Sequence, residues 1–255
     1  MWAYTYATES EQWMHVPEIA SFRFGSRSDE ALVVPERQSH PIRPDVIQDA
    51  FQRLVLPMAL HACGREVIHA SAVIVPRGVV AFCGPSQSGK STVAYGLHRR
   101  HGHPVWADDS LVFAVSTDRA VAVPYPHRLR IRKEAANYFN LLELRKRDTS
   151  SWTALEQAQE EPAPLACLFL LERHRTGDPV ETLPLSPGQA FASVIGNAYS
   201  FRPSDPERKR SMVESYLTLV RHVPVFRLRF ESTLDHLSTM LDCVESALDD
   251  VTAGR

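Results

Sequence analysis

The chain has 255 residues, of which 44% are hydrophobic, so it can bury a core as one domain or as one domain with a small appendage. Its formal net charge of −2 argues against a nucleic-acid-binding protein, because such proteins are expected to carry a clearly basic face. No apolar stretch approaches the roughly 20 residues of a membrane-spanning helix, and the N-terminus has no basic segment followed by an apolar one. We therefore expect a soluble cytoplasmic protein with neither nucleic acid nor a membrane among its partners.

The cysteines agree with a reducing compartment. Four cysteines are widely spaced without a C-x-x-C pair, and three of them lie in apolar runs: Cys63, Cys83, Cys167 and Cys243. Free thiols are therefore expected in place of disulfides or a zinc site.

The chain begins with a segment of short strands. Residues 1–35 mix aromatic, polar and short apolar runs such as Glu30–Pro35, and this pattern predicts strands in preference to a helix. We take residues 1–43 as a β-rich N-terminal portion and residues 44–255 as the main α/β domain. That domain opens with a helix at Pro44, which has apolar residues at i, i+3 and i+4 spacings, a possible kink at Pro57 and an end near Gly64.

Two apolar strands follow the helix. Residues 66–75 predict one strand, and Pro76-Arg77-Gly78 predicts a turn into a second strand at Gly78–Cys83. The short turn indicates that the two strands are antiparallel neighbours. The second strand leads directly into the most informative motif of the chain.

That motif, from Gly84 to Ser91, matches the Walker A pattern G-x-x-x-x-G-K-[ST] at every required position. Its glycines let the backbone aim several N–H groups at a phosphate, and a helix beginning near Lys90 adds its positive end. Lys90 is then expected on the β/γ-phosphates and the Ser91 hydroxyl on a magnesium ion. The strand before the loop and the helix-compatible stretch after it argue against an incidental turn. The expected nucleotide-binding residues are Gly84, Pro85, Ser86, Gln87, Ser88, Gly89, Lys90, Ser91 and Thr92.

A pair of carboxylates supplies the next candidates. Asp108 and Asp109 end a short apolar strand that starts near His103, one helix downstream of the loop. In α/β folds the carboxyl end of such a strand opens onto the nucleotide crevice. Adjacent residues of a strand point to opposite faces, so one acid alone would serve a metal unless the strand has already ended in a turn. The alternative is a solvated turn in which the acids cap the backbone.

The remaining elements are typical of a mixed α/β domain. Expected in order are a hairpin at 110–115 and 120–123, a helix at 133–146, an exposed segment at 147–164, a buried central strand at 164–171, a helix from about 204 to 220, a strand at 223–230 and a last helix with an apolar stripe from Leu234 to Leu248. Arginines that could assist phosphoryl transfer, or simply form a charged face, are Arg128, Arg130, Arg132, Arg202, Arg208 and Arg210, together with Lys209.

His69 alone would be interpreted as a buried core residue, but its spacing to the loop suggests more. His69, the loop at 84–91, Arg100-His101-Gly102-His103 and Ala107-Asp108-Asp109 together resemble the kinase domain of the bacterial HPr kinase/phosphorylase family. The resemblance is dense over residues 66–113. It implies a P-loop α/β fold of the phosphoenolpyruvate carboxykinase type, and transfer of phosphate from ATP to a serine hydroxyl of a protein. It further implies His69 as an active-site histidine, Asp108 as the base, and Ser91 with Asp109 on Mg2+.

The chain departs from the family after the acidic pair. At the position of the family's Glu-Ile-Arg-Gly-Leu-Gly-type signature stands Leu129-Arg130-Ile131-Arg132-Lys133, so neither phosphorylase activity nor HPr as substrate is expected. The compact form is similar to HPr-kinase-like proteins of ribosomal-peptide maturation, including lasso-peptide kinases that phosphorylate the C-terminal serine of a precursor. The sequence therefore predicts an ATP- and Mg2+-dependent serine kinase acting on a peptide or small protein. The alternatives are a kinase of a small-molecule hydroxyl, such as free serine or a sugar, and a non-catalytic ATP-binding regulatory protein. Because the enzymes of that family are hexameric, the resemblance leaves a homo-oligomer as one expectation.

Overall fold

The computed structural model describes residues 3–7, 11–25, 30–36, 41–141, 152–153, 161–174, 178–200, 205–231 and 233–252. The chain divides into two compact units, one made of Met1–Val67 with Ala198–Glu214 and the other of Ile68–Asn197 with Ser215–Arg255. Among the described residues, no helix is both long and apolar enough to cross a membrane.

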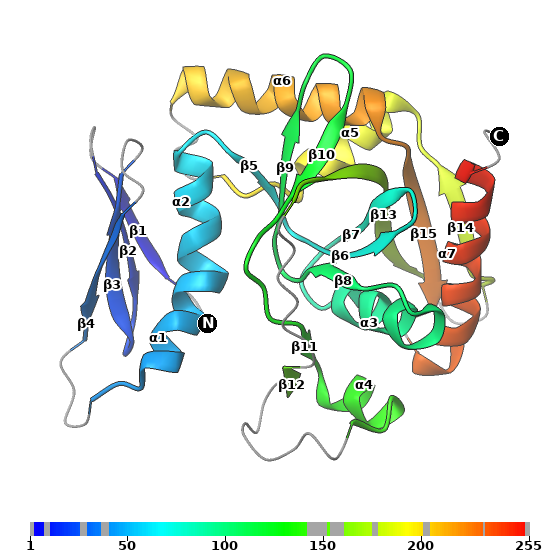
Figure 1. Cartoon of the computed structure of the whole chain (residues 1–255), viewed down its shortest axis with the longest axis horizontal. Helices are drawn as coiled ribbons and strands as arrows, with labels where there is room; N and C mark the ends of the chain where they lie inside the picture. The colour runs from blue at the N-terminus through cyan, green and yellow to red at the C-terminus, as the bar shows by residue number, and fades with distance from the viewer. Residues whose placement is uncertain are drawn as a thin grey trace. The chain divides into compact units, whose positions relative to one another are not determined.

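The first unit contains a four-stranded antiparallel sheet in simple up-and-down order (Figure 1). Its strands are β1 (Tyr4–Ala7), β2 (Gln12–Val16), β3 (Ala20–Phe24) and β4 (Ala31–Pro35). Alternate residues of β2 and β3 are buried, among them Met14 and Phe22, as expected for a sheet with one covered face. The β-rich start expected from the sequence is therefore confirmed.

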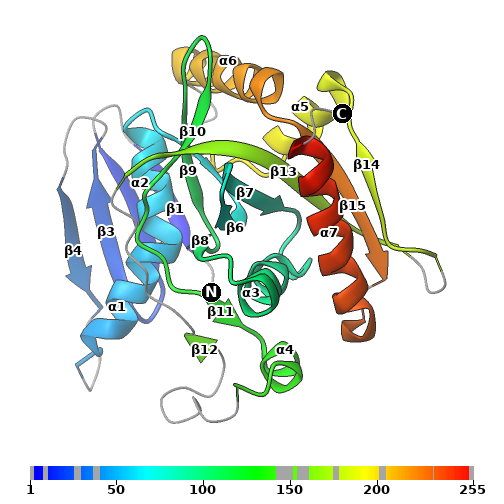
Figure 2. The same cartoon turned by 45° about the vertical axis from the view of Figure 1, so that its right-hand side comes forward.

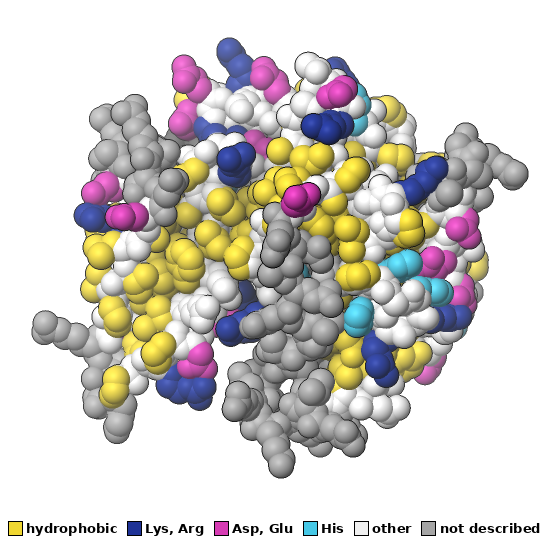
Figure 3. Space-filling view, in the orientation of Figure 1, with side chains coloured by type: hydrophobic (Ala, Val, Ile, Leu, Met, Phe, Trp, Pro, Cys, Tyr) yellow, Lys and Arg dark blue, Asp and Glu magenta, His cyan; other side chains and the backbone are white. Residues whose placement is uncertain are grey.

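Large apolar side chains remain exposed on the two edge strands of this sheet. They are Tyr4 and Tyr6 on β1 and Leu32 and Val34 on β4. Figure 3 shows hydrophobic side chains gathered over the sheet of the first unit.

A continuous helical segment covers the face of the sheet that carries the buried side chains of Met14 and Phe22. It consists of α1 (Pro44–Ala50), a π-helical turn η1 (Phe51–Val55) and α2 (Leu56–Ala62), and its Ala50 and Val55 join the core formed with β2 and β3. The irregularity expected at Pro57 takes the form of the π turn, in which the Leu56 N–H bonds to the Phe51 carbonyl five residues earlier. Since Pro57 has no N–H to continue the regular ladder, the departure from α-helical pairing falls where the sequence places a proline.

The second unit is built on a mixed sheet. Strands follow one another across it in the order β9, β10, β13, β7, β6, β8, while β15 pairs with β13 and β14 with β15. Their bounds are β6 (Ala70–Val75), β7 (Gly78–Cys83), β8 (Val105–Ala107), β9 (Leu111–Val115), β10 (Ala120–Val123), β13 (Ala163–His174), β14 (Glu181–Pro184) and β15 (Val225–Glu231). The chain is therefore a mixed α/β protein with an antiparallel N-terminal sheet.

Strand direction determines where the functional loops emerge. β7 runs parallel to β13, and β13 parallel to β15, whereas β6 is antiparallel to both of its neighbours, β7 and β8. β7 and β8 consequently point the same way on the two sides of β6. The loop after Cys83 and the residues after Ala107 thus leave the sheet at one edge, together with the start of β6.

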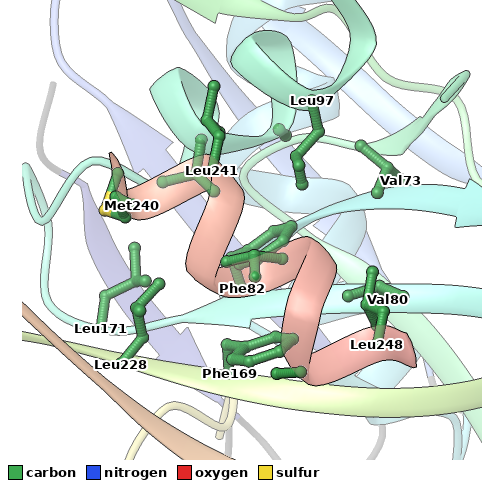
Figure 4. Packing of buried hydrophobic residues seen from close by; sticks show 14 of the residues in the cluster. Val73, Val80, Phe82, Leu97, Phe169, Leu171, Leu228, Met240, Leu241 and Leu248 are labelled. Carbon is green, nitrogen blue, oxygen red and sulfur yellow. The ribbon is translucent and has the colours of Figure 1, made fainter. Parts of the chain in front are cut away.

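Two helices, α3 (Lys90–His101) and α7 (Leu237–Thr252), pack side by side on one face of this sheet (Figures 1 and 2). Their apolar faces meet the buried side chains of the central strands, and Figure 4 shows Leu241 and Leu248 of α7 in one cluster with Phe82 and Phe169. The rings of Phe82 and Phe169 stack with centroids 5.6 Å apart. The apolar stripe of the last helix is core packing, as the sequence predicted, and a 3-10 turn at Leu234–His236 precedes it.

Several boundaries differ from expectation. The strand expected at 66–75 is broken into β5 (Glu66–Ile68) and β6, because the His69 N–H bonds to the Asn197 carbonyl at 2.8 Å and leaves the ladder. The helix expected at 133–146 is α4 (Lys133–Tyr138), and Asn140 follows it with a positive φ of 55°. Residues 142–146 of that expected helix, and residues 147–151 and 154–160 of the expected exposed segment, lie outside the described part of the chain.

Some elements carried no clear sequence signal. They are the two-residue strands β11 (Arg130–Ile131) and β12 (Trp152–Thr153), the strand β14, and helix α5 (Pro187–Ile195), which starts with a capping box of Ser186 and Gln189. Helix α6 (Pro206–His222) begins where it was expected, but its first N–H groups bond to the carboxylate of Asp205. Ser204, where the sequence placed the start of this helix, lies outside the described residues.

Candidate active site

The Walker A segment forms a tight loop between β7 and α3. Gly84 has a φ of +149° and Gly89 a φ of +107°, both in the range that side-chain-bearing residues rarely adopt. A Cβ added at Gly84 would also lie 2.9 Å from the Ser88 hydroxyl and 3.2 Å from the Leu171 carbonyl oxygen. The glycines of the motif are therefore required by the path of the backbone, which turns sharply from the strand into the helix.

Lys90 is the first residue of α3 and lies inside the loop. Only 5% of its surface is exposed, and its Nζ donates to the Gly84 and Pro85 carbonyl oxygens, each at 3.0 Å. Burial lowers the pKa of the ammonium group, while the negative charges of nearby carboxylates, Asp109 before Asp108, act in the opposite direction. The loop carbonyls thus accept hydrogen bonds from Lys90 that phosphate oxygens could accept in their place.

Ser91, the second residue of α3, meets the first acid of the pair. Its Oγ donates to Asp108 Oδ1 at 2.7 Å, and the Ser71 Oγ donates to the same oxygen at 2.6 Å. The second carboxylate oxygen, Oδ2, accepts the Arg130 backbone N–H at 2.9 Å. The structure therefore joins residues from α3, β6, the end of β8 and β11 around one carboxylate.

The environment of Asp108 opposes its ionisation. Burial and the neighbouring charge of Asp109 raise the pKa of the Asp108 carboxyl from 3.8 to about 6, although the hydrogen bonds from Ser71, Ser91 and Arg130 favour the charged form. Such a carboxylate, desolvated yet held by three donors, is characteristic of functional sites. A cation placed beside it would restore the charge that burial disfavours.

Asp109 occupies a different environment. β8 ends at Ala107, and Asp109 takes a positive φ of 63°, so the two acids follow a turn and do not alternate across a strand. Asp109 is half-buried, and its carbonyl oxygen lies 2.8 Å from His69 Nδ1. Because a carbonyl oxygen only accepts hydrogen bonds, the proton of this contact belongs to His69. The structure thereby brings His69 to the acidic pair, although through the backbone of Asp109.

The remaining loop residues differ in exposure. Pro85, Ser86 and Gln87 are exposed, Ser91 and Thr92 are half-buried, and Ser88 is buried. The Ser88 Oγ has no hydrogen-bond partner among the described residues. An orphaned hydroxyl inside a phosphate loop fits a cradle that an anion completes.

Sequence reasoning missed two contacts at this site. Ser71 lies in an apolar strand and had no motif to mark it. Arg173, near the end of β13, donates through Nη2 to the Gln87 carbonyl of the loop. The sequence signal that could have found Arg173 is its position near the carboxyl end of a predicted central strand. That strand, β13, runs parallel to β7, so its end lies beside the loop that follows β7.

Among the arginines proposed from the sequence, Arg208 is already engaged within the first unit. It donates to Glu66 Oε1 at 2.7 Å, to the His61 carbonyl at 3.0 Å and to His61 Nδ1 at 2.7 Å. Arg130 contributes to the acidic pair with its backbone N–H. Lys209 and Arg210 are exposed, and Arg202 lies outside the described residues.

The donor set at the loop fits Mg2+ and a nucleotide. Mg2+ prefers hard oxygen ligands and is commonly held by one or two side chains together with substrate phosphates. The Ser91 hydroxyl and the Asp108 carboxylate supply such oxygens next to the phosphate loop. The described residues contain no group of three or more His, Cys, Asp or Glu side chains that could hold a metal ion. Water molecules and phosphate oxygens would supply the other ligands of a Mg2+ ion bound there.

Comparisons with known proteins found similarity among solved structures. No protein-family model matches the chain, and no curated protein does. Among solved structures, the chain is similar to the Hpr(Ser) kinase/phosphatase from Coxiella burnetii, with 11% sequence identity and a TM-score of 0.36 over 71% of this chain and 95% of that one.

Proposed function

We propose that this protein is an ATP- and Mg2+-dependent kinase that transfers the γ-phosphoryl group to a serine hydroxyl of a peptide or small protein. The observation that carries the proposal is the hydrogen bond between Ser91 of the Walker A loop and Asp108. It unites, in one site, the two functions that phosphoryl transfer requires of a protein, a phosphate cradle and a carboxylate beside a metal-binding hydroxyl.

The loop would bind the phosphates of ATP. Its backbone N–H groups and the N-terminus of α3 favour negative charge, and Lys90 is already directed into the loop. On nucleotide binding the Lys90 ammonium group would exchange the Gly84 and Pro85 carbonyls for phosphate oxygens. The exchange costs little, since one set of oxygen acceptors replaces another.

The geometry favours a division of roles between the acids that is the reverse of the one implied by resemblance. Asp108 contacts Ser91 and is 4% exposed, so we place it with Ser91 on the metal side. Bound there, Mg2+ would neutralise charge on the transferring phosphoryl group. Asp109 is half-buried and is the main negative charge acting on Lys90, so we assign it to the acceptor side.

In the proposed reaction, the acceptor serine attacks the γ-phosphorus of ATP. The serine oxygen forms a bond to the γ-phosphorus, the bond from that phosphorus to the β,γ-bridging oxygen breaks to leave ADP, and the serine proton passes to the Asp109 carboxylate. His69 would hold the Asp109 backbone through its Nδ1–H bond to the carbonyl oxygen. Lys90 would stabilise the negative charge that develops on the phosphate oxygens.

The choice of acceptor is supported by the sequence resemblance over residues 66–113. The first substrate to test is therefore a lasso-peptide precursor with a C-terminal serine. Free serine and a sugar test the alternative of a small-molecule kinase, and binding of ATP without any product tests the non-catalytic alternative.

The deciding experiment measures phosphate transfer from labelled ATP to the peptide with wild type, Lys90→Ala, Asp108→Asn and Asp109→Asn. Each of the three substitutions is expected to lower kcat/KM on the order of a hundredfold or more. Asp118→Asn, at an exposed turn where Asp118 bonds to Ser116, is the control and should retain full activity. No transfer by the wild type to any acceptor, or transfer unaffected by Lys90→Ala, would overturn the proposal.

A further inference from the structure

We infer that Ser71 is a positioning residue that holds the Asp108 carboxylate in the orientation in which Asp108 and Ser91 together receive Mg2+ with the nucleotide. This inference rests on the proposed function. It concerns a residue on β6, between the strand that feeds the phosphate loop and the strand that ends at the acidic pair.

The hydrogen bonds of the site leave Asp108 little freedom. Oδ1 accepts the hydroxyls of Ser71 at 2.6 Å and Ser91 at 2.7 Å, and Oδ2 accepts the Arg130 N–H at 2.9 Å. With donors at both oxygens, rotation of the carboxylate would break at least one bond. Two of these donors, Ser71 and the Arg130 backbone, lie outside the phosphate loop and so anchor the carboxylate independently of it.

Ser71 is the side chain best suited to be this anchor. It is fully buried, and its strand neighbours Ala70, Ala72 and Val73 are fully buried and apolar. A hydroxyl in such a strand is unfavourable unless it is hydrogen-bonded, and the partner available here is Asp108. Its Oγ also lies 3.5 Å from the Ser91 Oγ, so the two hydroxyls converge on one oxygen.

A fixed Asp108 carboxylate orients the hydroxyl of Ser91. To serve as a metal ligand, the Ser91 oxygen must direct a lone pair to the ion while its O–H group continues to donate to Asp108 Oδ1. That arrangement requires Oδ1 to remain in place when the ion arrives, and Ser71 supplies the fixed bond that keeps it there. Preorganisation of this kind is what hydrogen bonds around metal-binding side chains commonly provide.

The test measures ADP binding by calorimetry, once with Mg2+ and once with EDTA, for wild type and Ser71→Ala. In Ser71→Ala we expect the gain in ADP affinity that Mg2+ produces to fall about tenfold, because a hydrogen bond to a charged group is lost. The affinity for ADP in EDTA should change less than about twofold. Ser71→Thr, which retains the hydroxyl, should recover most of the gain. In the Asp108→Asn background, Ser71→Ala should have no further effect, because the two residues act as a unit.

The matched control is Ser116→Ala, which removes a hydroxyl that donates to Asp118 at 2.7 Å in an exposed turn and should leave both affinities unchanged. An equal loss of affinity with and without Mg2+ in Ser71→Ala, or a Mg2+ gain equal to that of wild type, would overturn the positioning role while leaving the kinase proposal intact. A wild type that binds ADP no better with Mg2+ than with EDTA would overturn both.

Discussion

The Ser91 hydroxyl donates a hydrogen bond of 2.7 Å to Asp108 Oδ1, although the two residues are 17 positions apart in the chain. Ser91 belongs to the first turn of α3, and Asp108 follows β8. Strand β6, which lies between β7 and β8, adds a hydrogen bond from the Ser71 hydroxyl to the same oxygen. This meeting of a Walker A serine with a buried acid is the structural basis of the proposed phosphoryl transfer.

The buried carboxyl of Asp108 should make stability depend on pH. Its pKa is raised from 3.8 to about 6, so between these values the folded state binds more protons than the unfolded state. The contribution of Asp108 to stability must therefore decrease as pH rises from 4 to 6, by on the order of 2–3 kcal/mol.

This prediction is checked by urea unfolding of metal-free wild type and Asp108→Asn between pH 4 and 7.5. The free energy of unfolding of wild type relative to Asp108→Asn should fall over that range. A difference between the two proteins that stays constant with pH would show that Asp108 ionises normally in the fold.

Gly84→Ala should damage the loop without abolishing folding. The added Cβ would lie 2.9 Å from the Ser88 hydroxyl, at a backbone φ of +149° that alanine tolerates poorly. We expect a loss of roughly 1–3 kcal/mol in unfolding free energy and at least a tenfold loss of ATP affinity, measured by calorimetric titration. Gly188→Ala, which has open space around its Cβ, should leave ATP binding unchanged; equal behaviour of the two variants would contradict the requirement for glycine.

Arg173→Ala should weaken nucleotide binding through the loop. Arg173 donates to the Gln87 carbonyl, and Gln87 itself has a positive φ of 71°. Loss of this bond should lower ATP affinity about three- to tenfold, since an exposed charge-assisted hydrogen bond stabilises modestly. Arg119→Ala, in the exposed turn between β9 and β10, is the control for a simple loss of positive charge, and an equal effect of both changes would show that only net charge matters.

Arg208→Ala should destabilise the first unit. The guanidinium pairs with Glu66, which is 5% exposed, and also with the ring and carbonyl of His61. Burial and the charge of Arg208 lower the pKa of His61 to about 4, so its neutral ring accepts the bond from Arg208. Removing Arg208 leaves the Glu66 charge buried without this partner, at a cost of about 3–5 kcal/mol.

Thermal or urea unfolding measures this loss, with Lys209→Ala, an exposed neighbour, expected within about 0.5 kcal/mol of wild type. A near-neutral Arg208→Ala would show that the ion pair adds nothing to the fold.

Local sequence patterns predicted much of the fold correctly because they report local physics. The hairpin of β6 and β7, the helix after the loop and the apolar stripe of α7 all follow from turn residues and hydrophobic periodicity. The break at His69 and the early end of α4 were not predictable in this way. In the first case the deciding contact is with Asn197, which lies far along the chain.

By itself, the sequence determined that a phosphate-binding loop lies between a buried strand and a helix, and that two acids end a nearby strand. Only the tertiary structure decided that Asp108 accepts a hydrogen bond from Ser91, that Ser71 donates to the same carboxylate, and that Arg208 belongs to an ion pair with Glu66. The physical reason is that a motif constrains the backbone of consecutive residues, whereas the direction of a side chain after a turn, and the partner it meets there, depend on how separate strands align across the sheet.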